Sequence, residues 1–94
     1  MSFSKREGAV GVAVRYTTAG TYVVKSKAGT LYRIIIGTTA AGAISIYDAT
    51  SASGTPVAVL KASIPEGSYA FGFVFRTGLT IVAGANSDIT VVYE

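Results

Sequence analysis

The sequence contains no cysteine, no histidine and no tryptophan. Without cysteine, the chain forms no disulfide, no thiolate metal site and no thiol nucleophile. Without histidine, it lacks the base of the common nucleophile pairs and the side chain that most often acts as a general base near neutral pH. These absences exclude most hydrolase chemistry, and we expect a protein that is not an enzyme.

Charged residues are also scarce. They make up 14% of the 94 residues, whereas about 25% is usual in soluble domains. The net charge of +3 is spread along the chain, with no basic run longer than Lys5 and Arg6, so we expect no nucleic-acid partner. No apolar stretch approaches the roughly 20 residues of a membrane helix. The short stretch Gly8–Val14 is at the lower limit of a signal peptide, and we interpret it as part of a first strand.

The carboxylates do not suggest an active site. Each lies at a terminus or beside a turn, which favours solvated turn residues over a glycosidase-type acid pair; they are Glu7, Asp48, Glu66, Asp88 and Glu94. Asp48 and Asp88 fit a turn-forming role in which the carboxylate accepts hydrogen bonds from nearby backbone N–H groups.

Two loops superficially resemble ligand sites. Gly37–Gly42 lacks the lysine and the helix that a phosphate-binding loop requires. Asn86–Asp88 has too few acidic groups for a calcium site. We therefore expect no cofactor, no metal and no small-molecule substrate.

Turn-forming residues recur about every ten residues and separate β-branched and aromatic runs, a spacing typical of sandwiches and barrels. We predict an all-β fold, a single-domain antiparallel β-sandwich over residues 9–94, with residues 1–8 as an N-terminal arm. The runs predict about eight strands, which are Ala9–Tyr16, Thr21–Lys27, Thr30–Ile36, Ala43–Asp48, Val57–Ser63, Ser68–Arg76, Leu79–Ala83 and Asp88–Tyr93.

Two of these runs alternate clearly. Ile44 and Ile46 should share one face, with Ser45 and Tyr47 on the other. The run from Ser68 to Arg76 places four aromatic rings on one face, and we predict that it is the central strand of the core; the rings are those of Tyr69, Phe71, Phe73 and Phe75.

Gly72 lies within this aromatic run. A glycine inside a strand indicates either a bulge or a point where facing rings press on the backbone. The sequence leaves both readings open.

Hydrophobic residues are half of the sequence, which is more than a chain of this length can shelter by itself. The run Ile34–Ile36 is apolar on both faces of its strand, so one face should meet another chain. We predict a homo-oligomer, with a candidate subunit interface at Tyr32, Ile34 and Ile36 or at their odd-numbered neighbours.

Four phrases of strand and turn residues follow one another along most of the chain: Gly20–Tyr32, Gly42–Gly54, Phe75–Val82 and Asp88–Tyr93. In this order they resemble the small β-sandwich structural proteins of tailed-bacteriophage virions, of the head-decoration, cement and head-fibre type. The resemblance implies a jelly-roll-like sandwich, often a homotrimer, made in the host cytoplasm and seated on the capsid exterior. Its partners would be its own copies and the major coat protein.

The N-terminal arm lies outside this resemblance. We hypothesise that Phe3, Lys5 and Arg6 contact the coat protein, although a frayed terminus would explain the same residues.

Two other functions stay open. One is a tail, baseplate or fibre component of the same kind of virion. The other is a small carbohydrate-binding module, for which the candidate exposed aromatic residues are Tyr32, Tyr47 and Tyr93.

Overall fold

The computed structural model describes residues 11–94, which form eight strands and no helix. The strands are β1 (Val12–Tyr16), β2 (Gly20–Lys25), β3 (Gly29–Thr38), β4 (Ile44–Tyr47), β5 (Ala58–Leu60), β6 (Gly67–Phe75), β7 (Leu79–Ala83) and β8 (Asp88–Tyr93). The all-β prediction is confirmed. The expected arm at residues 1–8, with Phe3, Lys5 and Arg6, lies outside the described residues.

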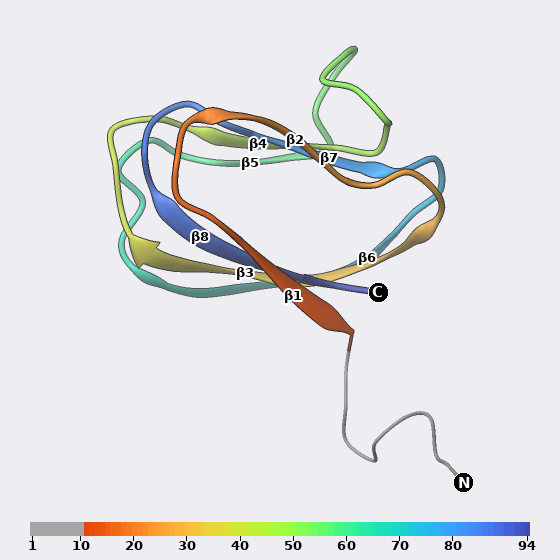
Figure 1. The fold of residues 1–94 in the computed structure, drawn as a ribbon, viewed down its shortest axis with the longest axis horizontal. Helices are drawn as coiled ribbons and strands as arrows, with labels where there is room; N and C mark the ends of the chain where they lie inside the picture. The colour runs from red at the N-terminus through yellow and green to blue at the C-terminus, as the bar shows by residue number, and fades with distance from the viewer. Residues whose placement is uncertain (1–10) are drawn as a thin grey trace, which may run out of the picture.

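The strands form two layers of four (Figure 1). Sheet A has the order β1-β8-β3-β6 and sheet B the order β2-β7-β4-β5. The pairs are nested, because β1 pairs with β8, β2 with β7, β3 with β6 and β4 with β5, all antiparallel. The chain is thus a long hairpin rolled into two sheets, which is the jelly-roll connectivity.

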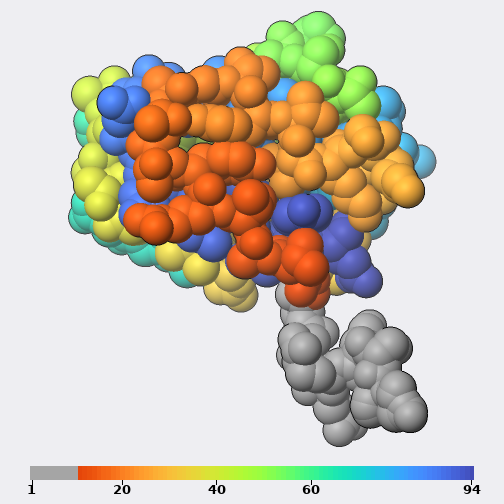
Figure 2. All heavy atoms as spheres, in the orientation of Figure 1, coloured from red at the N-terminus to blue at the C-terminus, as the bar shows by residue number. Residues whose placement is uncertain are grey.

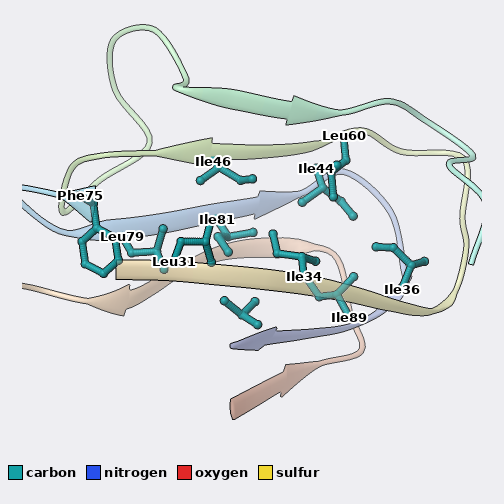
Figure 3. Packing of buried hydrophobic residues seen from close by; sticks show 11 residues of the cluster. Leu31, Ile34, Ile36, Ile44, Ile46, Leu60, Phe75, Leu79, Ile81 and Ile89 are labelled. Carbon is teal, nitrogen blue, oxygen red and sulfur yellow. The ribbon is translucent and has the colours of Figure 1, made fainter. Parts of the chain in front are cut away.

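The core lies between the two sheets (Figure 3). Sheet B contributes a row in which Ile81 pairs with Ile46, and sheet A contributes Ile34 and Ile36 opposite Val91 and Ile89. All five isoleucines and the valine are at most 2% exposed. Burying such side chains contributes about 1.5–3 kcal/mol each, and this stabilises the chain without any disulfide.

The alternation predicted for β4 is confirmed. Ile44 and Ile46 are buried, whereas Ser45 and Tyr47 are half-buried on the opposite face of the strand. Because the side chains of a strand alternate, this one strand fixes the inward and outward rows of its neighbours in sheet B.

The prediction that the aromatic strand is central is wrong, because β6 is an edge strand of sheet A. Its rings do face inward as expected. Phe75 is fully buried, and Tyr69, Phe71 and Phe73 pack against the core while remaining partly exposed. Because an edge strand has only one neighbour, most of its rings lie at the rim of the core. Phe75, at the end of β6, is the ring of this strand that is fully enclosed.

Gly72 forms a bulge in this edge strand. The pairing register of β3 and β6 shifts beside it, and its φ is +71°. No atom lies within 4 Å of the position that a Cβ would take. Of the two readings left open by the sequence, the bulge is therefore the observed one, and no ring presses on this backbone.

A candidate docking face on sheet B

The isoleucines predicted for the subunit interface are not on the surface. Ile34 is fully buried and Ile36 is 2% exposed, both inside the core of the chain. The odd-numbered neighbours Arg33 and Ile35 face outward instead. The sequence held the signal, because a guanidinium is rarely buried without a partner, and alternation from Arg33 places Ile34 inside.

Tyr32 breaks the alternation with Ile34. The register of β3 against β8 shifts between Leu31 and Arg33, so Tyr32 is the additional residue of a bulge. Its ring is half-buried outside the core cluster, and its hydroxyl donates a hydrogen bond to the Glu94 carboxylate. Of Tyr32, Ile34 and Ile36, Tyr32 alone lies at the surface, whereas the alternative set contributes the outward-facing Ile35, which is 37% exposed.

The outward side of sheet B is a different candidate. Its first row follows the pairing of Thr21 with Val82, Val82 with Ser45, and Ser45 with Val59. This row crosses all four strands. Every side chain in it is uncharged, and two of the four are valines.

The second row runs beside the first. It contains Val23 paired with Thr80, and Thr80 paired with Tyr47. Val57 lies next in line, because its N–H donates to the Ile46 carbonyl at 2.7 Å just before β5 begins. We call the two rows together the valine face; it consists of Thr21, Val23, Ser45, Tyr47, Val57, Val59, Thr80 and Val82.

The valine face is uncharged, and its valines on and beside the edge strands are accessible. Val23, Val57 and Val59 are 50%, 52% and 54% exposed. Thr80, in contrast, is fully buried, and its hydroxyl donates to the Ala49 carbonyl at 2.7 Å. Three half-exposed valines gather on one uncharged face, so this surface is a candidate for contact with another molecule.

The outward side of sheet A has a different character. Arg15 donates to both oxygens of Asp88 at 2.7 and 2.8 Å, and Arg33 donates to the Ser68 hydroxyl at 2.7 Å. The Arg15 guanidinium lowers the pKa of the Asp88 carboxyl below its ordinary value, and the same ion pair raises the pKa of Arg15. These groups satisfy one another and remain hydrated, and they lie among exposed apolar side chains such as Ile35 and Val74, so the outer side of sheet A is a mixed surface of charged and apolar groups.

A loop of small uncharged residues projects beside the valine face. It covers residues 49–56, between β4 and β5, and rises from the body on the side of sheet B that faces away from sheet A (Figures 1 and 2). Its residues Thr50 to Thr55 are all exposed. The loop therefore adds uncharged surface next to the valine face.

Asp48 holds the base of this loop. Its carboxylate accepts hydrogen bonds from the backbone N–H groups of Arg76 and Thr77 at 2.8–2.9 Å, and a longer one from Gly78 at 3.4 Å. These bonds, from Thr77 and Arg76 first, lower the pKa of the Asp48 carboxyl below its ordinary value. Asp48 does accept from backbone N–H groups, but the predicted role in its own turn is wrong, because its partners belong to a turn about thirty residues away.

The other carboxylates of residues 11–94 also have specific partners. Asp88 pairs with Arg15, in place of the turn role predicted for it, and Glu66 accepts from the Thr39 N–H at 3.0 Å. Within this range no three acidic, histidine or cysteine side chains are grouped as a metal ion would require. No helix of suitable length or hydropathy for crossing a membrane occurs in the same range.

The three tyrosines proposed for carbohydrate binding do not share a surface. Tyr47 belongs to the valine face on sheet B, whereas Tyr32 lies on sheet A beside Glu94. Tyr93 packs against the core. A sugar ring resting on aromatic side chains would meet one of them at a time.

Comparisons of the chain with protein-family models, with curated proteins and with solved structures found no match. The features that bear on function are therefore the jelly-roll fold and the uncharged face on sheet B.

Proposed function

We propose that this chain is a non-enzymatic structural protein of a tailed-bacteriophage virion, in the form of a capsid decoration or cement protein. In this function it self-associates and binds the major coat protein on the outside of the capsid. The family is taken from the resemblance of the four sequence phrases, and the observation that carries the assembly function is the valine face.

Physical chemistry supports an assembly function over a solitary one. Apolar surface left in water opposes solubility, whereas the same surface buried against another chain contributes about 25 cal/mol per Å². The three exposed valines, of which two lie on edge strands and Val57 just before one, would gain this contribution only in a complex. The uncharged valine face also avoids the desolvation cost of burying charged side chains.

A second surface would be needed to bind the coat protein while copies associate. We propose that the N-terminal arm, with Phe3, Lys5 and Arg6, supplies it. Deleting residues 2–7 should then lower the occupancy of the protein on capsids without changing its thermal unfolding midpoint. Unchanged occupancy would rule out the arm as a coat contact.

The location on the particle is testable by electron cryomicroscopy of virions from the phage whose genome encodes this sequence. We expect density for an eight-stranded sandwich on the outer capsid surface, and additional density bridging coat subunits. Density on the tail, baseplate or fibre would replace the capsid proposal with the alternative location. Particles without the protein anywhere would overturn the proposed function.

A further inference from the structure

We infer that the valine face is a self-association surface, on which two copies of this chain pack sheet B against sheet B across a two-fold axis. The inference rests on the proposed function, because it names the partner of the same face. It is argued from the distribution of charge, from the polar groups on the face and from the available area.

The charge distribution permits this contact. The whole chain carries a net charge of +3, which would oppose the approach of a second copy. None of the charged side chains of residues 11–94 belongs to the valine face, and the segment from Ala49 to Leu60 contains none either. Two copies that meet through this face keep their positive groups at the rim or on the far sheet.

The same distribution selects against a foreign partner. A typical protein surface carries many charged groups, and burying them against the uncharged valine face removes their water without supplying a counter-charge. The outer side of sheet A is such a surface, because it carries Arg15 and Arg33. Among the surfaces of residues 11–94, the valine face is the one without charged groups, so a second copy can match it by presenting the same face.

The hydroxyl groups of the face suit a two-fold contact. In such an interface each residue meets its symmetry mate or a residue of the same set. A hydroxyl both donates and accepts a hydrogen bond, so Thr21, Ser45 and Tyr47 can pair with identical groups. A face with only donors or only acceptors would leave them unpaired when it met its own copy.

The area limits the strength of the contact. Four strands spaced about 4.8 Å apart, each with four or five residues rising about 3.3 Å, cover roughly 300 Å². A standard interface buries about 800 Å² on each partner. The projecting loop of residues 49–56 extends the surface on the same side (Figure 2), so we expect a pair that is weaker than a standard complex and forms only at high protein concentration.

Light scattering at increasing concentration tests this inference on the full chain of 9.6 kDa. The wild type should rise from the mass of one chain to that of two. Val59→Lys and Val23→Lys each introduce one lysine per copy into the face and should raise the dissociation constant at least about 100-fold, because the lysines must be buried. Val74→Lys is the matched control, since Val74 is 62% exposed on an edge strand of sheet A.

The thermal unfolding midpoint of each variant shows whether it is folded before its mass is compared. Val23 and Val59 lie on different edge strands, so either variant alone suffices if the other is unstable. A wild type that stays a single chain at several hundred micromolar, a mass of three chains, or folded lysine variants that still dimerise would each overturn the inference. If the lysine variants remain wild-type in mass but no longer bind capsids, the face binds the coat, and the proposed function stands without this inference.

Discussion

Both carboxylate oxygens of Asp48 accept a hydrogen bond from the backbone N–H of Arg76, each at 2.9 Å. Asp48 follows the last residue of β4, and Arg76 follows the last residue of β6. This contact therefore joins an interior strand of sheet B to the edge strand of sheet A. It ties together the base of the projecting loop and the turn before β7, and it closes one end of the sandwich.

Replacing Asp48 should destabilise the fold. Asp48→Ala removes the acceptor for the N–H groups of Arg76 and Thr77, and we expect the free energy of unfolding to fall by about 2–3 kcal/mol. Asp48→Asn keeps one acceptor oxygen and should lose less. Urea denaturation measures both, with Ser53→Ala in the exposed loop as the control; equal stability of all three variants would contradict the closing role of Asp48.

The stability should also fall in acid. The pKa values of the Asp48 and Asp88 carboxyls lie below their ordinary value in the folded chain. Because the folded-state pKa is the lower one, the stabilisation is complete above the unfolded value of about 3.9 and is lost as the pH falls through the folded-state pKa. Urea midpoints measured from about pH 6 to about pH 2 should decrease below about pH 4, and less steeply in Asp48→Asn. A decrease of the same steepness in this variant would show that other groups are responsible.

Phe75 and Phe73 allow a matched comparison on one face of one strand. Phe75 is fully buried, and we expect Phe75→Ala to lower the free energy of unfolding by about 3–5 kcal/mol. Phe73 is partly exposed at the rim of the core, so Phe73→Ala should cost clearly less. Guanidinium unfolding measures the loss of stability in each variant. A larger loss for Phe73→Ala than for Phe75→Ala would mean that the core is centred nearer to Phe73.

Gly42 is a position of close approach. A Cβ built there would lie 2.5 Å from the Ala85 nitrogen and the Gly84 carbonyl carbon, so Gly42→Ala should cost about 1–3 kcal/mol through forced backbone shifts. Gly37→Ala is the control, because a Cβ built there would have the Asp88 carboxyl carbon as its nearest neighbour, at an ordinary contact distance of 3.4 Å. Differential scanning calorimetry should show a lower midpoint for the first variant and little change for the second.

Local pattern in the sequence was sufficient for the strands and for much of their orientation. Alternation placed Ile44 and Ile46 on one face and Ser45 and Tyr47 on the other, and the structure has the isoleucine face inside. It could not decide which strand lies at an edge, because strand order depends on pairing between distant segments. The aromatic strand β6 was therefore predicted at the centre, where the structure has β3 and β8.

The candidate site was less predictable for the same reason. Val23, Val59 and Val82 belong to strands far apart in sequence, and only the order β2-β7-β4-β5 brings them onto one surface. The partners of Asp48 are likewise in a turn about thirty residues away. In the case of Ile34 and Ile36, however, the neighbouring Arg33 was a local signal that would have indicated the inward direction.

The nested pairing has a consequence for biosynthesis. Strand β8 lies between β1 and β3, and Val12 pairs with Tyr93, so β1 has no neighbour in its sheet until the last strand has been translated. The nascent chain on the ribosome therefore exposes the apolar edge of β3 throughout most of its synthesis. The sandwich can close only after β8 has emerged from the ribosome, through a slow, non-local step, and truncation before β8 should yield an aggregating chain in place of a smaller folded domain.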